Sequence, residues 1–396
     1  MSVNAKDKLD PGRSAIWNDA RYRALFFQVL VLVAVIAFFV FIVNNTLENL
    51  ARRGIASGFG FLSSTAGFGI IMHLIEYSEE SSYGRAFLVG LLNTLLVSSL
   101  GIVFATTLGF FVGICRLADN WLLARLAAAY IEVLRNIPLL LQIFFWYFAV
   151  LRLLPLPRRS LEIGGTVFLN IRGLYMPSPI LEPGFEAVAL AFIVAIVAVI
   201  LVERWAHRRR EATGLYFPTP YVSIGILAGA PLITAIATGL PLSWEFPELK
   251  GFNFVGGMVL IPEFAALLVA LSAYTAAFIA EIVRAGIQSV NRGQIEAAYS
   301  LGLKPGQTLR LIIIPQALRV IIPPLTSQFL NLTKNSSLAV AIAYPELVSV
   351  FAGTVLNQTG QAIEVIVLTM AVYLTISLLI SLFMNWYNRK VALAGG

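Results

Sequence analysis

Apolar stretches recur along this chain, and eight of them approach the roughly 20 residues that a helix needs to cross a bilayer. They lie at about 25–43, 88–114, 127–151, 187–203, 220–240, 258–280, 316–335 and 364–385. Lipid offers the backbone no hydrogen-bond partner, so each crossing segment has to be helical. The pattern predicts an all-α membrane protein with about eight transmembrane helices. We expect the first stretch to be retained, because it lies far from Met1 and lacks a small-residue cleavage site.

Three of the segments between these stretches are long and rich in Gly, Ser and Pro, at about 44–87, 152–186 and 241–257. We expect them to be partly ordered, as short strands or interfacial helices. The chain shows no convincing internal repeat, which disfavours the secondary transporters built from inverted repeats.

The composition agrees with this pattern. Of 396 residues, 58% are hydrophobic and 12% are charged, a charged share about half that of soluble domains. A soluble enzyme and a disordered chain are therefore excluded. The single cysteine, Cys115, excludes an intrachain disulfide, and His73 and His207 lie too far apart in sequence to suggest a metal site.

The basic residues predict the orientation. With the N-terminus inside, 19 of the 28 Lys and Arg residues fall in inner segments and 8 in outer segments, while Lys334 lies in or beside a span. The positive-inside rule then places both termini in the cytoplasm. The run Arg208 to Arg210 is interpreted as a topology anchor facing anionic lipid. The net charge of +7 is thus assigned to membrane topology, not to nucleic-acid binding.

The polar segment 281–324 carries the most informative pattern. A helix-forming run, Gln294 to Leu301, stops at Gly302, a residue suited to a left-handed helix end. Pro305 can begin the next helix, where its missing N–H costs nothing. Ala297 and Ala298 would keep one face small enough for another protein to pack against it. An ordinary amphipathic loop helix is the alternative.

The residues of this segment resemble a known motif. Glu296-Ala297-Ala298, then Gly302, then Ile312-x-Ile314-Pro315 is similar to the EAA loop of permease subunits in bacterial ABC importers, with Ile314 in place of the usual Leu. Further blocks are similar to the polar amino acid permeases of the histidine/glutamine type: Ala273-Tyr274, Ala280 to Ile287, Gly293-Gln294, Ile314 to Arg319, Asn136 to Gln142 and Lys334 to Leu338. The likeness covers about 88–151 and 258–390. The longer form resembles the permeases of general L-amino acid and glutamate/glutamine/aspartate/asparagine importers.

The resemblance implies an architecture. It predicts the five-helix core of a type I ABC importer, three extra helices and a cytoplasmic EAA coupling helix. Residues 1–87 would form an N-terminal tail, the extra first helix and an outer loop. Residues 88–390 would form the permease domain, with an outer loop and a helix pair inserted at about 152–257. The location would be a bacterial inner membrane.

The resemblance also implies a function and partners. The chain would import polar L-amino acids, including acidic ones and their amides. Its partners would be a cytoplasmic ATPase dimer, a second homologous permease and a periplasmic binding protein. Coupling to the ATPase would involve Glu296, Ala297, Ala298, Gly302 and Pro315. Because Gly302 to Thr308 lacks the Lys of a GxxxxGK(S/T) loop, we expect no ATP hydrolysis and no cofactor in this chain, with ATP and Mg²⁺ bound by the ATPase.

Physical reasons accompany two of these expectations. A carboxylate early in a short helix gains about 0.3–1 kcal/mol from the helix dipole, so Glu296 is predicted to stabilise the start of the coupling helix, and it can also pair with a basic residue of the ATPase. Proline removes backbone hydrogen bonds, so Pro323 and Pro324 are predicted to break the seventh span into movable parts.

Polar residues in or near the spans are candidates for the substrate path: Lys334, Asn331, Asn335, Ser336, Tyr274, Thr275, Glu281 and Arg284. A mid-span charge costs about 2.5–3.5 kcal/mol, so Lys334 either attracts a substrate carboxylate or snorkels to the outer interface. Glu281 and Arg284 share a helix face. They either form an ion pair that fixes the loop, contact substrate, or snorkel to the membrane interface. Any other polar residue could equally bond a neighbouring helix.

An ion-gradient-driven secondary transporter is the alternative function. Such proteins tend to carry unpaired acidic residues within their spans. The predicted spans show little of this, since Glu186 and Glu364 lie at span ends. The coupling loop therefore favours the ABC permease.

Overall fold

The computed structural model describes residues 20–52 and 57–393. The chain divides into two compact units, Met1–Leu91 with Leu347–Thr375, and Leu92–Glu346 with Ile376–Gly396. Two long helices, α2 (Tyr83–Cys115) and α12 (Ala362–Leu393), contribute residues to both units.

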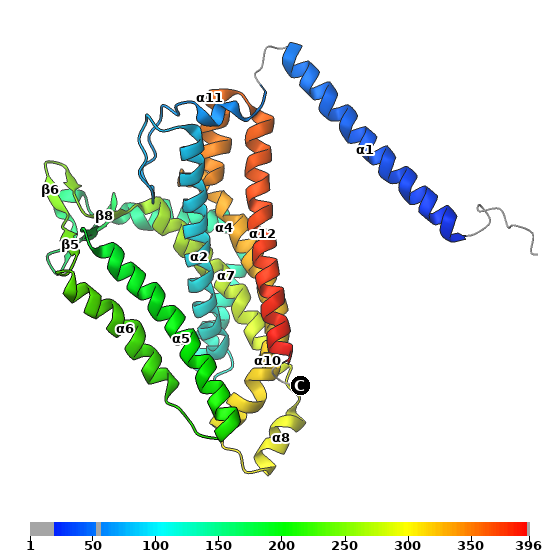
Figure 1. Cartoon of the computed structure of the whole chain (residues 1–396), viewed down its shortest axis with the longest axis vertical. Coiled ribbons are helices and arrows are strands. Elements are labelled where there is room, and N and C mark those ends of the chain that lie inside the picture. Colours follow the sequence, from blue (N-terminus) through cyan, green and yellow to red (C-terminus); the bar gives the residue numbers. More distant parts are fainter. Residues whose placement is uncertain (1–19, 53–56, 394–396) are drawn as a thin grey trace, which may run out of the picture. The chain divides into compact units, whose positions relative to one another are not determined.

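Within the described residues, seven helical segments are long and apolar enough to cross a membrane (Figure 1). They are α1 (Ala20–Arg52), α2, α5 (Phe185–Thr213), α6 (Thr219–Ala237), α7 (Pro262–Gln288), α12 and the segment Pro305–Ile342, which contains α10 (Ile314–Asn335). A bent helix pair, α3 (Trp121–Asn136) with the segment Leu139–Leu153, supplies an eighth if the pair is one span. The predicted count of about eight is confirmed.

The single span expected at 127–151 is wrong in shape, because two helices meet there at 106°. Ile137 lies before Pro138 and is extended (φ −96°, ψ 126°). The proline ring disfavours a helical conformation of the residue before it, because the two would clash. The helix therefore ends at Asn136, and α4 (Leu139–Phe144) begins after the proline. The buried Gln142 amide donates to the carbonyls of Leu134 (2.8 Å) and Ile137 (2.9 Å), which satisfies backbone groups at the break.

The predicted break at the proline pair is also wrong, because α10 continues through Pro323 and Pro324. Both prolines lie on the exposed side of the helix, so their rings do not disturb its buried side. The irregularity of this span comes earlier, in the π-helical turn η6 (Leu309–Ile313). A 3-10 segment, η7 (Ser336–Ile342), follows α10.

The first unit has an aromatic core. Phe61 of η2 (Phe59–Ser63), Tyr83 of α2 and Phe351 of η8 (Val348–Val355) are buried and in ring contact. The Tyr83 hydroxyl donates to Gln358 of α11 (Leu356–Thr359) at 3.0 Å, and Glu364 accepts from the Gly58 amide at 2.6 Å. The segment that leads into α2 is thus ordered from residue 57 onward, as expected.

The second unit is built around α7, the most buried of the described spans. Its buried residues pack on α10, α3 and α4. Helix α2 approaches closely, because a Cβ at Gly109 would lie 2.6 Å from Cβ of Ile279 and one at Gly113 would lie 2.9 Å from Cβ of Val283. These glycines, four residues apart, allow the two backbones to pack together.

The long segments at about 152–186 and 241–257 form short antiparallel strands, as expected. One sheet has the order β1 (Leu161–Ile163), β2 (Val167–Asn170), β3 (Gly173–Met176) and β8 (Met258–Leu260). Two smaller sheets pair β4 (Ser178–Leu181) with β5 (Leu242–Glu245) and β6 (Glu248–Lys250) with β7 (Asn253–Val255). Helices α5 and α6 leave from and return to these strands as a hairpin (Figure 1).

Candidate functional site

A short helix, α8 (Arg292–Ser300), follows α7 and precedes α9 (Pro305–Thr308). Its N-cap, Asn291, accepts a hydrogen bond from the Gly293 amide at 2.8 Å. Gly302 has φ +78° and donates to the Tyr299 carbonyl at 2.9 Å, while Leu303 donates to Ala298 at 3.1 Å. This pair of bonds is a Schellman motif. The predicted helix end at Gly302 and helix start at Pro305 are confirmed.

The predicted coupling residues fall on different sides of α8. Glu296 and Ala297 are exposed, whereas Ala298 is only 3% exposed and packs inside the chain. The two alanines therefore do not form one small outer face. Two apolar side chains that the sequence analysis missed, Tyr299 and Leu301, are 50% and 82% exposed. In the sequence, these two apolar residues lie just before Gly302 in an otherwise polar segment, and that pattern could have identified them.

Contrary to the prediction, Glu296 does not stabilise the start of α8 through the helix dipole. The carboxylate belongs to the fifth of nine residues, beyond the first turn in which the dipole acts. The Asn291 side chain caps the helix instead. Glu296 is exposed and forms no ion pair within residues 20–52 and 57–393.

Pro315 is the second residue of α10, where the π-helical turn η6 gives way to an α-helix. The start of α9, further back in the chain, is fixed by Gln307, whose side chain accepts from the Lys304 amide at 3.0 Å. Pro315 is half-buried, so it marks the start of α10 but does not form part of the exposed face of α8.

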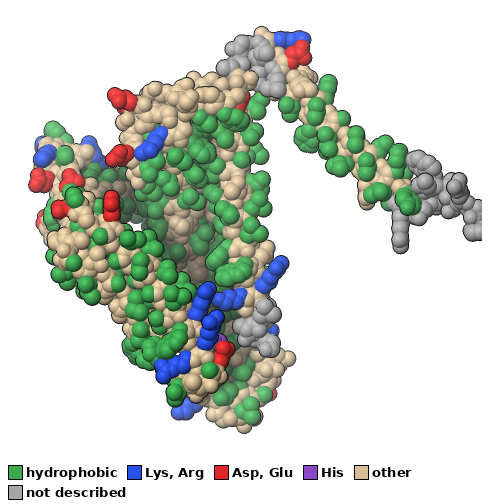
Figure 2. Space-filling model, viewed as in Figure 1, with side chains coloured by type: hydrophobic (Ala, Val, Ile, Leu, Met, Phe, Trp, Pro, Cys, Tyr) green, Lys and Arg blue, Asp and Glu red, His purple; other side chains and the backbone are tan. Residues whose placement is uncertain are grey.

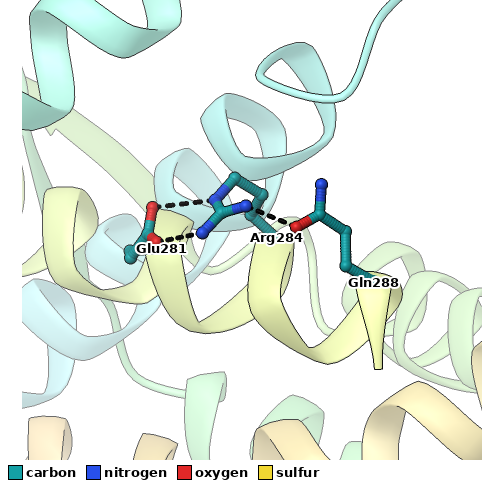
Figure 3. A network of polar contacts seen from close by, with 3 residues as sticks. All are labelled: Glu281, Arg284 and Gln288. Carbon is teal, nitrogen blue, oxygen red and sulfur yellow. Dashed lines mark hydrogen bonds and ion pairs between the residues drawn. The ribbon is translucent and has the colours of Figure 1, made fainter. Parts of the chain in front are cut away.

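Glu281 and Arg284 form the predicted ion pair (Figure 3). Arg284 Nε donates to Glu281 Oε2 at 3.0 Å, Arg284 NH2 donates to Glu281 Oε1, and Arg284 NH1 donates to Gln288. The side chains of Glu281 and Arg284 are about one-third exposed. All three residues belong to the last turns of α7, so the network stabilises the end of the helix that leads into α8.

Several predicted path residues share one side of α10. Ser327, Asn331 and Lys334 are exposed, and Gln328 and Asn335 are half-buried. Their spacing of three and four residues places them on one helix face, called here the α10 polar face. Ser327 and Gln328 were missed by the sequence analysis, although the same spacing could have identified them.

The remaining path candidates lie elsewhere. Ser336 is fully buried and donates to the Thr333 carbonyl at 2.7 Å. On α7, Thr275 is 3% exposed, and half-buried Tyr274 contacts Phe278 with ring centroids 5.0 Å apart. These residues are therefore not on the α10 polar face. No group of His, Cys, Asp and Glu able to hold a metal occurs among the described residues.

Comparison with known proteins shows which family the chain resembles. Residues 214–393 match the family described as the binding-protein-dependent transport system inner membrane component. The chain is 60% identical to the putative amino-acid ABC transporter permease protein YhdX of Escherichia coli, over 94% of each chain. It is 54% identical to the general L-amino acid transport system permease protein AapQ of Rhizobium johnstonii, over 96% of this chain and 95% of AapQ.

A third relative is the glutamate/glutamine/aspartate/asparagine transport system permease protein BztB of Rhodobacter capsulatus, 44% identical over 96% of each chain. A solved structure, an amino acid ABC transporter with histidines, is 21% identical with a TM-score of 0.46, covering 78% of this chain and 95% of that chain. These relatives give no support to an ion-gradient-driven transporter. The chain is similar to three such proteins over nearly its whole length. It therefore belongs to the multi-pass inner-membrane permease subunits of amino-acid ABC transporters.

Proposed function

We propose that this permease imports a broad range of polar L-amino acids, including acidic ones and their amides. AapQ is named for general L-amino acid transport and BztB for transport of glutamate, glutamine, aspartate and asparagine, and this chain matches both over nearly its whole length. That near-full-length match is the observation that carries the proposal.

The exposed face of α8 supports a second part of the proposal, that a separate cytoplasmic ATPase docks there. Glu296 offers an exposed carboxylate, and Leu301, the C-cap residue of the same helix, offers a large exposed apolar side chain. Gly302 ends α8, and Pro315 lies further along the chain in the first turn of α10. In this proposal the ATPase dimer binds ATP and Mg²⁺, and the permease itself does not hydrolyse ATP.

The α10 polar face supports a further part, a second homologous permease that completes a heterodimeric pore. Exposed Ser327, Asn331 and Lys334 would be costly against lipid, where polar groups find no partners. A partner permease or a water-filled path removes that cost. A periplasmic binding protein would deliver the amino acid to the outer end.

The orientation in this proposal has both termini in the cytoplasm. The basic run of α5, Arg208 to Arg210, and the basic pair near the C-terminus, Arg389 and Lys390, belong to the second unit. Figure 2 shows Lys and Arg side chains gathered where these helices end. Such a concentration of positive charge is typical of the cytoplasmic side.

The experiment is reconstitution of this permease with its partner permease and ATPase in lipid nanodiscs. We expect ATP hydrolysis to rise when binding protein loaded with L-glutamate or L-glutamine is added. The proposal would be contradicted if no ATPase co-purified with the folded permease. It would also be contradicted if the rate of ATP hydrolysis did not change on addition of loaded binding protein.

A further inference from the structure

A second polar site lies at the end of α7 opposite α8. It is a pocket of about 310 Å³, at the lower end of the range for small-molecule sites. The lining comes from three separate elements: Tyr147, Leu151 and Arg152 after α4, Ile171 and Arg172 in the β2–β3 turn, and Pro262 and Glu263 at the start of α7. Since α7 has 27 residues and is about 40 Å long, this pocket is one bilayer thickness from the coupling helix.

The pocket holds charges of both signs that do not neutralise each other directly. Arg152 and Arg172 supply two guanidinium groups, and Glu263 supplies a carboxylate. Within the described part of the chain, none of the three forms an ion pair. The Glu263 Oε1 atom accepts from the Tyr147 hydroxyl at 2.8 Å, which leaves its second oxygen to accept from a ligand.

Local contacts hold these groups in position. The Arg152 guanidinium lies 5.2 Å from the centre of the Phe148 ring, a cation–π contact. The Arg172 amide donates to Asn170 Oδ1 at 2.8 Å, which fixes the β2–β3 turn. Glu263 is in the first turn of α7, where the helix dipole favours a carboxylate. A charged ligand would thus meet Arg152 and Glu263 held by neighbouring groups, and Arg172 carried on a fixed turn.

We propose that this pocket binds the α-carboxylate and α-ammonium groups of the transported amino acid at the outer end of the permease. Arg152 and Arg172 pair with the carboxylate, since guanidinium and carboxylate match in charge and geometry. Glu263 accepts from the ammonium group while Tyr147 orients it. The proposal rests on the proposed amino-acid import, and it assigns a recognition site for the groups that all amino acids share.

This assignment explains how one site serves different substrates. The lining offers charged partners for the two invariant groups, while Leu151, Ile171 and Pro262 offer only apolar contact. The substrate side chain is therefore not read by a charge in this pocket. The main competing occupant is the binding protein itself, whose surface could dock on the two arginines.

The test uses the full complex in proteoliposomes, with uptake of radiolabelled L-glutamate and, separately, L-histidine. The variants are Glu263→Gln, which keeps an oxygen for Tyr147, and Arg172→Gln. The matched control is Arg159→Gln, an exposed arginine of the same outer segment that does not line the pocket. Loaded binding protein is the varied component, and ATP hydrolysis is recorded in parallel.

We expect both pocket variants to lower the maximal uptake rate about tenfold or more for both amino acids, as for loss of a charge-assisted hydrogen bond. The half-saturating concentration of binding protein should stay within about twofold. Arg172→Lys should retain most of the rate, and Arg159→Gln should resemble the parent.

Other outcomes overturn the proposal. A raised half-saturating concentration at unchanged maximal rate would assign the arginines to binding-protein docking. Loss for only one of the two amino acids would assign the pocket to side-chain recognition, and unchanged uptake would remove its role. If the parent complex shows no uptake driven by loaded binding protein, the proposed function fails, a result distinct from these.

Discussion

The Glu281 carboxylate accepts two hydrogen bonds from the Arg284 guanidinium, one turn further along α7. Arg284 also donates to Gln288 at the last residue of the helix. The chain of contacts thus runs along the final turns of α7 to within a few residues of α8. The network therefore stabilises the end of the most buried described span, just before the chain enters α8.

The first prediction concerns this ion pair. Glu281→Ala and Arg284→Ala should each lower the thermal stability of the purified permease, and the double variant should lose little more than either single one. The reason is that each single change removes the same interaction, so the coupling energy should fall in the range of about 0.5–3 kcal/mol. Thermal melting of the four proteins in one detergent measures it. Strictly additive losses would mean that the pair contributes nothing of its own.

The second prediction concerns the exposed face of α8. Glu296→Lys and Leu301→Ser should leave membrane insertion and the melting temperature unchanged. Each should reduce the ATP hydrolysis stimulated by loaded binding protein about tenfold. The reason is that the first change removes a negative charge, and the second an exposed apolar contact, from an interface. Glu296→Gln should have a smaller effect. Normal stimulation in Glu296→Lys would exclude this carboxylate from the contact with the ATPase.

The third prediction concerns the helix end at Gly302. An alanine there must adopt φ near +78°, which costs about 1–2 kcal/mol for an L-residue, although no atom lies within 4 Å of the added Cβ. Gly302→Ala should therefore weaken the stimulation of ATP hydrolysis. Gly306→Ala adds the same methyl group into open space at an ordinary φ and serves as the control. Equal behaviour of the two variants would show that the turn is not limiting.

The fourth prediction concerns the contact between α2 and α7. Gly109→Ala and Gly113→Ala should each destabilise the permease by about 1–3 kcal/mol, because the new Cβ would overlap with Ile279 or Val283. Gly225 and Gly229 on α6 have the same spacing and no atom within 4 Å of an added Cβ. Alanine at these two positions is the matched control, and melting temperatures should separate the two pairs.

The fifth prediction concerns Lys334 on the α10 polar face. Lys334→Ala should raise the amino-acid concentration for half-maximal uptake about tenfold, since a charge-assisted contact to a substrate carboxylate is lost. Lys334→Arg keeps the charge and should be milder. Lys250→Ala removes an exposed outer lysine as a control. Unchanged uptake kinetics in Lys334→Ala would assign the side chain to the outer interface.

The sequence was sufficient for features that a short stretch of residues determines. Span length follows from bilayer thickness, so seven of the eight apolar stretches correspond to single helical spans among the described residues, and 127–151 corresponds to the bent pair. Gly302 and Pro305 each impose a local backbone conformation, so both ends of the turn after α8 were predictable. The Glu281–Arg284 pair followed from spacing on one helix.

Other features depend on tertiary surroundings. One proline, Pro138, marks a bend of 106°, whereas two adjacent prolines leave α10 continuous. The difference lies in the extended residue before Pro138, in the Gln142 amide that satisfies the freed carbonyls, and in the exposed side on which Pro323 and Pro324 lie. A sequence pattern does not carry that information.

The outer pocket was missed for a similar reason. Tyr147 and Glu263 are 116 residues apart and belong to different spans, and Arg172 comes from a strand turn. No periodicity connects them, so only the folded chain shows that they meet. Likewise, the burial of Ala298 next to exposed Ala297 depends on how α8 rests on the rest of its unit.

The pairing of β3 with β8 has a consequence for how such a chain can change over generations. Met176 lies opposite Met258 in the sheet, so everything between them, including the α5–α6 hairpin, leaves and returns at neighbouring positions. An inserted segment whose two ends already lie side by side adds little loop-closure entropy cost to the folding of the residues around it. The gene segment that encodes the hairpin can therefore be inserted, exchanged or deleted as one unit. The helices on either side would keep their packing.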